Sequence, residues 1–329
     1  MPTSASHPGR DVTRRASAAV VAAMVLSAMA AAPAAADQRD AAFTDTAGTT
    51  STYHLFTDAA GSQPVGLVVY FDGDGQYGHK NPTSTWALGG RDGLVAQAAA
   101  RRLATLSIRT PDRVGSETWW ENGRVNAAYA ADLIDKTRRD LGVDRVWVVG
   151  YSGGSQLITK WLTPLHGSTL GRGGAVITGG GGAPPVTASF PEGFPAGFPM
   201  TWHTGTADTS GYNAYADARR GADWYSQRGF TVTREWPAGV DHDDLGGQFG
   251  SIFAAAYDKA PNPTPTPTPT PTPPPPTPTG SPTATPTATP TTSPTSPQWP
   301  ETAAWNAWCR AAPWAAFPVE SCIAMRPRP

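Results

Sequence analysis

The chain has 329 residues, a formal net charge of −1 and a hydrophobic fraction of 39%. A charge so close to zero, with no basic run in the body of the chain, argues against a nucleic-acid-binding protein, whose binding face is usually basic. The two cysteines, Cys309 and Cys322, lie near the C-terminus, so the rest of the chain can hold neither a disulfide scaffold nor a cysteine-ligated zinc or iron–sulfur site.

The first residues have the features of an export signal. Three arginines precede an apolar run over residues 16–32, and alanines at 34–36 provide small residues for cleavage after Ala36. The alternative is a membrane anchor, but the alanine-rich run is shorter than the roughly 20 residues that a span needs. We therefore predict that residues 1–36 are a signal peptide and that the mature protein is secreted and extracellular, with no membrane association after cleavage.

Residues 37–258 alternate two kinds of pattern, which predicts one catalytic domain. Short continuous apolar runs are typical of strands buried on both faces. They occupy residues 67–71, 104–108, 145–149, 175–177, 200–203 and 230–236. Helical patterns lie between or after them, at 125–141, 156–162, 212–228 and 245–257, and the first places Val125, Tyr129, Leu133 and Leu141 on one face. This alternation predicts an α/β fold, with a mostly parallel sheet covered by helices on both faces.

The remaining residues differ in composition from this domain. Residues 259–298 are rich in proline and threonine, which alternate from Pro263 to Thr272, and this predicts an extended, semi-rigid linker. Residues 299–329 form a tail with four tryptophans, and Cys309 and Cys322 could close a disulfide that stabilises so small a module. The tryptophans could stack on a polysaccharide or a polyester, or they could form the core of the module itself.

The segment Gly150-Tyr151-Ser152-Gly153-Gly154 fits the pattern G-x-S-x-G. A predicted strand precedes it and a predicted helix follows it, which is the setting of a nucleophile elbow. The turn is too tight for bulky neighbours, and it holds the serine in a strained conformation above the carboxyl edge of the sheet. Ser152 is therefore the predicted catalytic nucleophile.

A serine nucleophile needs a base and an acid, which follow it in the order Ser, Asp or Glu, His in this arrangement. His242 is the only histidine after position 203, and it comes after the last predicted strand. Asp208 follows the strand at 200–203 and a short turn, whereas Asp217 and Asp223 fall within the next helix. We predict His242 as the base and Asp208 as the acid that orients it.

Two backbone N–H groups should hold the oxyanion. One belongs to Gly153, directly after the nucleophile, and the other to the loop after the strand at 67–71. We assign the second to Asp74, with Gly75 as the alternative. Carboxylates at Asp72 and Asp74 should oppose the developing charge unless they turn away or bind a cation. The loop resembles a calcium loop only faintly, because the later ligands are missing, and we predict no metal.

Trp119 and Trp120 follow another predicted strand, the one at 104–108. Loops at this edge border the site, so both tryptophans are candidate substrate-binding residues. Packing in the core is the competing interpretation.

The elbow, the segment 205–208 and the late His242 resemble those of the α/β-hydrolase superfamily, over about residues 50–258. The compact domain with its leader and Pro/Thr linker resembles secreted esterases of the polyhydroxybutyrate depolymerase and feruloyl or acetylxylan esterase group. Many of those begin the oxyanion loop with His-Gly, where this chain has Asp72-Gly73. The resemblance implies an α/β-hydrolase fold and ester hydrolysis through an acyl-serine intermediate, without a cofactor.

The sequence thus predicts a secreted serine carboxylic-ester hydrolase that acts on a polymer-linked or plant-derived ester. A serine peptidase would use the same residue types. A hydrolase fold without catalysis, used for surface or glycan binding, is the third interpretation, and the complete set of Ser152, Asp208 and His242 argues against it.

Overall fold

The computed structural model describes residues 36–260, except residues 62, 114 and 116. Nearly all of the predicted signal peptide and linker, and the whole predicted tail with its disulfide, lie outside the described residues. None of the helices in the described part is both long and apolar enough to cross a bilayer.

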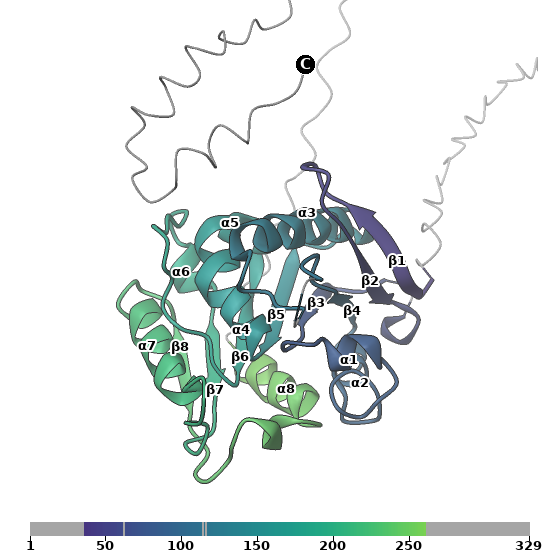
Figure 1. Ribbon diagram of the computed structural model, residues 1–329. Coiled ribbons are helices and arrows are strands. Elements are labelled where there is room, and N and C mark those ends of the chain that lie inside the picture. The colour runs from purple at the N-terminus through teal and green to yellow at the C-terminus, as the bar shows by residue number, and fades with distance from the viewer. Residues whose placement is uncertain (1–35, 62, 114, 116, 261–329) are drawn as a thin grey trace, which may run out of the picture. The chain divides into compact units, whose positions relative to one another are not determined.

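The described residues form a sheet of eight strands in the order β1-β2-β4-β3-β5-β6-β7-β8. β1 and β2 pair antiparallel, as do β2 and β4, and every later pairing is parallel. The strands are β1 Gln38–Thr44, β2 Thr50–Phe56, β3 Gly66–Phe71, β4 Leu103–Ile108, β5 Arg145–Tyr151, β6 Arg172–Thr178, β7 Met200–His203 and β8 Val232–Glu235. Because the parallel strands run the same way, their carboxyl ends meet at one edge (Figure 1).

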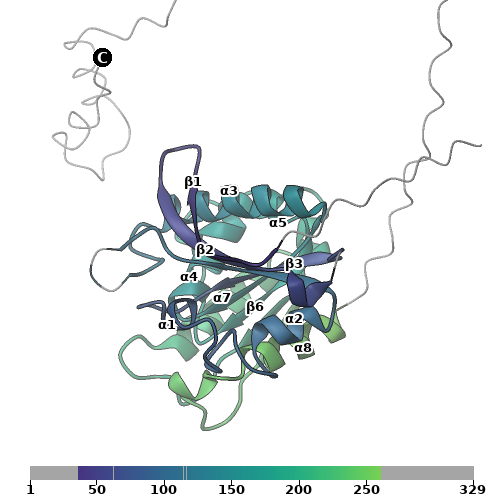
Figure 2. The same ribbon diagram turned by 90° about the vertical axis from the view of Figure 1, so that its right-hand side faces the viewer.

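Helices cover both faces of this sheet. Figure 2 shows α3 and α5 on one side of the strands and α2 and α8 on the other. The helices are α1 Tyr77–Lys80, α2 Leu94–Ala99, α3 Gly123–Leu141, α4 Gly153–Leu157, α5 Thr163–Leu170, α6 Phe194–Gly197, α7 Ala214–Ser226 and α8 Phe249–Lys259, and a π-helical turn at Ile158–Leu162 joins α4 to α5. The predicted α/β-hydrolase fold is confirmed.

Two hydrophobic cores explain the continuous apolar runs of the central strands. In β3, Leu67 and Val69 point into the core beneath α3 and α7, while Val68 and Tyr70 point into the core beneath α2 and α8. Side chains alternate between the faces of a strand. A strand with a core on each side therefore needs an apolar residue at every position.

The structure differs from the sequence-based prediction in several places. The hairpin β1–β2 was not predicted, because its strands mix polar and apolar residues at the edge of the sheet. The predicted helix at 156–162 begins earlier, at Gly153. The apolar face predicted for 125–141 is not buried at its first residue, since Val125 is 52% exposed, while Tyr129 and Leu133 are fully buried.

Candidate active site

Ser152 lies in the turn between β5 and α4 with φ 50° and ψ −112°. This is the strained conformation expected of a nucleophile elbow. The glycines around it are a steric requirement. A Cβ at Gly154 would lie 2.0 Å from the carbonyl oxygen of Phe71, and one at Gly150 would lie 2.7 Å from the backbone nitrogen of Ser155. The spacing G-x-S-x-G is therefore what allows β5, the turn and α4 to pack against β3.

The elbow is fixed to the neighbouring strand β6 through Thr178. The backbone nitrogen of Ser152 donates to the carbonyl oxygen of Thr178 at 3.0 Å. The buried hydroxyl of Ser155 donates to the same oxygen at 2.7 Å and accepts from the Thr178 nitrogen at 3.0 Å. Sequence reasoning did not assign a role to Ser155, although a buried polar residue in the first turn of the helix is a signal for such an anchor.

The structure brings Ser152, His242 and Asp208 together from three separate loops. Nε2 of His242 lies 2.9 Å from Oγ of Ser152, and Nδ1 of His242 lies 2.7 Å from Oδ2 of Asp208. An ionised carboxylate can only accept, so Nδ1 carries the proton and Nε2 is free to take the proton of the serine hydroxyl. The side chain of Asp208 is 2% exposed and that of His242 is 30% exposed, so the carboxylate is shielded while the imidazole faces the pocket.

The ring of His242 has further support from the elbow itself. The Tyr151 ring lies 5.0 Å from it, centroid to centroid, at an interplanar angle of 33°. The Tyr151 hydroxyl donates to the carbonyl oxygen of His242 at 3.3 Å. The residue before the nucleophile thus helps to position the loop that carries the base.

The two predicted oxyanion donors are neighbours in space. Gly153 is the first residue of α4, where a backbone N–H has no acceptor within the helix. A Cβ at Gly153 would lie 3.5 Å from the backbone nitrogen of Asp74. Gly75, the alternative, has φ +80° and continues the turn toward α1. The structure therefore places the backbone of Asp74 beside Gly153, as the assignment requires.

The two carboxylates of this loop behave differently. The Asp72 side chain is buried away from the pocket and accepts from Tyr70 Oη at 2.8 Å, from the Gly73 nitrogen at 2.8 Å and from the His79 nitrogen at 2.9 Å. It holds the loop in shape. The Asp74 side chain stays in the pocket, where burial raises the pKa of its carboxyl and a hydrogen bond from Trp120 partly offsets that rise.

A pocket of about 530 Å³ lies over the elbow. Its lining combines the three residues above with the loops after β3, β4 and β7. The lining residues are Asp74, Trp120, Ser152, Gln156, Asp208, Ser210, Tyr212, His242 and Asp243. Gln156, Ser210, Tyr212 and Asp243 were not predicted, although each lies within four residues of a predicted site residue.

The two tryptophans after β4 have different positions. Trp120 is 39% exposed and lines the pocket, where its Nε1 donates to Oδ2 of Asp74 at 3.0 Å. Trp119 is fully buried, and its ring meets that of Phe71 edge-on at 5.3 Å and 88°. The prediction that Trp119 binds substrate was wrong. It is a core residue, because adjacent side chains in this turn point to opposite sides.

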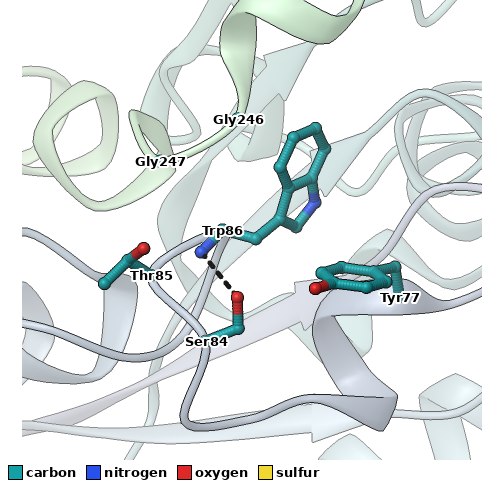
Figure 3. Close-up of a pocket in the computed structure, with 6 residues that line it drawn as sticks. All are labelled: Tyr77, Ser84, Thr85, Trp86, Gly246 and Gly247. Atoms are coloured by element: carbon teal, nitrogen blue, oxygen red, sulfur yellow. Dashed lines mark hydrogen bonds between the residues drawn. The ribbon is translucent and has the colours of Figure 1, made fainter.

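A second pocket, of about 440 Å³, lies between the segment after α1 and the segment after His242 (Figure 3). The rings of Tyr77 and Trp86 stand nearly perpendicular at 6.1 Å and 84°. Trp86 packs so closely on Gly246 that a Cβ there would lie 2.0 Å from the indole, and its carbonyl oxygen accepts from the Gly247 nitrogen at 2.6 Å. Trp86 thereby fixes the segment that follows the base.

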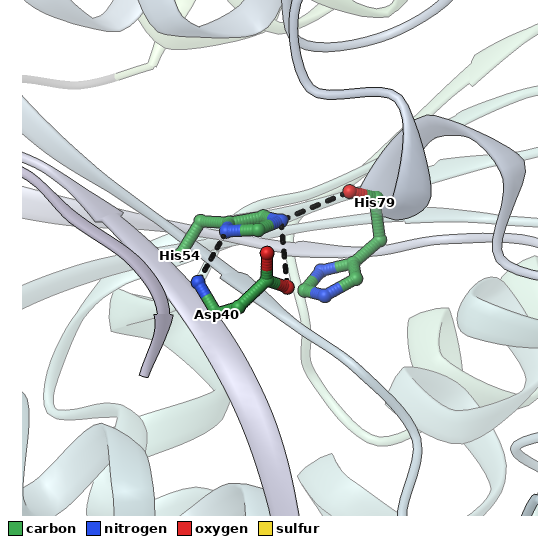
Figure 4. A group of neighbouring side chains, drawn as sticks. All are labelled: Asp40, His54 and His79. Atoms are coloured by element: carbon green, nitrogen blue, oxygen red, sulfur yellow. Dashed lines mark hydrogen bonds and ion pairs between the residues drawn. The ribbon is translucent and has the colours of Figure 1, made fainter. Parts of the chain in front are cut away.

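Asp40, His54 and His79 also lie close together, away from this site (Figure 4). Nδ1 of His54 accepts from the Asp40 nitrogen at 3.0 Å, so its ring proton is on Nε2, which donates to the His79 carbonyl oxygen at 3.0 Å. Neither nitrogen of His54 then has a free lone pair for a metal ion. The three residues do not fit a metal site, and the stacked rings of the two histidines, 4.2 Å apart, are a structural contact.

The His79 ring should make the fold sensitive to acid. Burial lowers its pKa to about 3, and the buried ring of His54 also has a lowered pKa. An unfolded chain takes up this proton near pH 6.5, so the stability from neutral His79 is present above about 6.5 and is lost as pH falls toward 3. For His79 alone we expect a loss of about 2 kcal/mol between pH 7 and 5.

Urea unfolding at pH 7 and pH 5 measures this loss. His79→Asn keeps a polar partner for Ser107, which lies 2.9 Å from Nδ1, but cannot titrate, so its stability should depend less on pH. His166→Asn, at a half-buried ring, is the matched control. It should change the pH dependence of the unfolding free energy less than His79→Asn does. An unchanged pH dependence in His79→Asn would contradict the assignment.

No protein-family model and no curated protein matches the sequence. Among solved structures, the chain is similar to a brefeldin A esterase described as a bacterial homologue of human hormone sensitive lipase (16% identity, 68% of this chain and 74% of that chain, TM-score 0.43). It is also similar to a carboxylesterase of Bacillus cereus (17%, 63% and 93%, TM-score 0.46) and to a serine hydrolase without a lid from Xanthomonas campestris (12%, 69% and 95%, TM-score 0.45). Similarity at this level does not establish the chemistry of this chain, which has to be argued from the geometry of its own site.

Proposed function

We propose that this protein is a secreted carboxylic-ester hydrolase that forms an acyl-serine intermediate. The observation that carries the proposal is the continuous relay Ser152–His242–Asp208, with contacts of 2.9 and 2.7 Å, at the base of an open pocket. A hydroxyl, an imidazole and a shielded carboxylate in this order are the parts that nucleophilic acyl transfer needs.

In the proposed reaction, Oγ of Ser152 attacks the ester carbonyl while Nε2 of His242 takes its proton. The N–H groups of Gly153 and Asp74 stabilise the oxyanion of the tetrahedral intermediate. His242 then gives the proton to the leaving alcohol, and the acyl group stays on Ser152. Water, activated by His242, attacks the acyl-serine and releases the acid, which restores the serine hydroxyl.

Matched esters and amides test this proposal. We expect turnover of a nitrophenyl acetate and of small alkyl esters, and far slower turnover of the anilide of the same acid, because the amide is less reactive toward the same nucleophile. Comparable turnover of ester and amide would instead favour a peptidase. No turnover of either, and no labelling by a fluorophosphonate, would indicate a fold used for binding only.

We further propose that the substrate is a polymer-linked or plant-derived ester, as in the secreted esterases that the sequence resembles. The support is the Pro/Thr-rich segment 259–298 and the tryptophan-rich segment 299–329. A second attachment point raises the local enzyme concentration at an insoluble surface.

Truncation after Ala260 separates hydrolysis of the ester from attachment to a polymer. This end point retains α8 with its ion pairs Arg101–Asp258 and Lys259–Glu235, so hydrolysis of a small soluble ester should be nearly unchanged. Adsorption to a polysaccharide or a polyester should weaken. Equal adsorption of the full-length and truncated proteins to every polymer tried would contradict the role of the tail, and a large loss on the small ester would contradict the domain division.

A further inference from the structure

The carboxylate of Asp74 is a part of the pocket that the proposed reaction does not use. Its Oδ2 accepts from Nε1 of Trp120 at 3.0 Å. Its Oδ1 lies so close to Gly153 that a Cβ there would be only 2.1 Å away. A carboxylate therefore stands beside the position where the oxyanion develops.

No cationic side chain balances this charge inside the pocket. The lining residues of the described chain include no lysine or arginine, and Asp208 and Asp243 add two further carboxylates. Lys160 lies behind Gln156, but its ammonium is paired with Asp217 at 3.0 Å and bonded to Gln156 at 3.0 Å. Nδ1 of His242 bonds Asp208 rather than Asp74.

An exposed aromatic side chain lies beside this carboxylate. Trp120 lines the pocket, is 39% exposed and bonds Asp74, whereas the ring of Tyr212 already has the ammonium of Lys160 5.9 Å from its centroid. A carboxylate beside an exposed indole is a combination that binds ammonium and guanidinium groups, through charge attraction and through the ring quadrupole.

We propose that Asp74 is a specificity-determining residue that favours substrates carrying a cationic group and disfavours substrates carrying a carboxylate. The inference rests on the proposed ester hydrolysis at Ser152. A cation near Asp74 neutralises a charge that otherwise opposes the oxyanion, whereas an anionic group adds a further negative charge beside Asp74. The preference should therefore be expressed in kcat/KM.

Nitrophenyl esters with the same three methylene groups between the acyl carbonyl and a neutral, cationic or anionic end group measure the effect. We choose the 5,5-dimethylhexanoyl ester as the neutral substrate, the 4-(trimethylammonio)butyryl ester as its cationic isostere and the glutaryl monoester as the anionic one. At low ionic strength, kcat/KM should be about tenfold higher for the cationic ester than for the neutral one, and about tenfold lower for the anionic ester. Added salt should reduce both differences.

Asp74→Asn tests the residue. Asparagine keeps the backbone N–H and an acceptor for Trp120 but removes the charge, so the differences among the three esters should fall to about threefold or less. Any effect of the substitution on oxyanion stabilisation that is the same for all three esters cancels in the ratios of their kcat/KM values. Asp92→Asn, which removes an exposed carboxylate before α2, is the matched control and should keep the wild-type ratios.

Equal kcat/KM for the three esters in the wild type, or unchanged ratios in Asp74→Asn, would overturn the inference. Turnover of the neutral ester without charge discrimination would leave the proposed function standing. Absence of turnover of all three esters would overturn the proposed function, and this inference with it.

Discussion

Replacing Ser152 with alanine should reduce kcat on a small ester by about 10⁶-fold. In the proposed reaction the hydroxyl of Ser152 forms the covalent bond, and alanine leaves no proton at this position for Nε2 of His242, 2.9 Å away, to accept. The side chain of Ser152 faces the pocket rather than a core, so its loss opens no cavity in the fold. The measurement is steady-state hydrolysis, with circular dichroism and thermal unfolding to show that the fold is intact.

Ser210→Ala is the matched control for this change. Ser210 lines the same pocket but makes no contact with His242 among the described hydrogen bonds. We expect Ser210→Ala to alter kcat by less than about tenfold. If Ser152→Ala retained more than a few per cent of wild-type turnover, with contamination excluded, Ser152 could not be the nucleophile.

Replacing Asp208 with asparagine should lower kcat by about 10⁴-fold while KM changes little. The amide no longer holds the proton on Nδ1, 2.7 Å away. The ring can then carry its proton on Nε2, where it blocks transfer from Ser152, and no carboxylate stabilises the imidazolium. Asparagine has nearly the same volume, so the effect is on the tautomer and charge of His242 rather than on packing.

Asp243→Asn is the control for loss of a carboxylate in the same pocket. Asp243 lines the pocket next to His242 but does not bond its ring, so we expect a change far smaller than that of Asp208→Asn. Similar losses in the two variants would show that general electrostatics, and not the specific contact with Nδ1, explains the effect.

The strands β3 to β8 and the proximity of Ser152, Asp208 and His242 could be predicted from the sequence because strong local rules apply to them. A strand between two cores must be apolar throughout, as Leu67 to Phe71 are. The elbow needs glycines at fixed positions because backbone atoms of Phe71 and Ser155 leave no room for a Cβ. Asp208 and His242 could be selected from chain order, because each follows a strand at the carboxyl edge of the sheet.

Other features depend on contacts between distant segments, which no local pattern contains. Trp119 and Trp120 are adjacent and identical in type, yet one packs on Phe71 and the other bonds Asp74. Asp72 and Asp74 are both aspartates followed by a glycine, so the sequence does not distinguish them. Only Asp72 is surrounded by hydrogen-bond donors, from Tyr70, Gly73 and His79. The hairpin β1–β2 lies at the edge of the sheet, where polar residues are tolerated and the apolar signal is weak.

The most direct test of the central claim is the mass of the protein and of its peptides after mixing with a nitrophenyl ester and quenching with acid during turnover. We expect a burst of nitrophenol and one acyl group on the peptide that contains Ser152, with neither in Ser152→Ala. An acyl group on another residue, or a burst without any acyl-protein, would contradict an acyl-serine intermediate at Ser152.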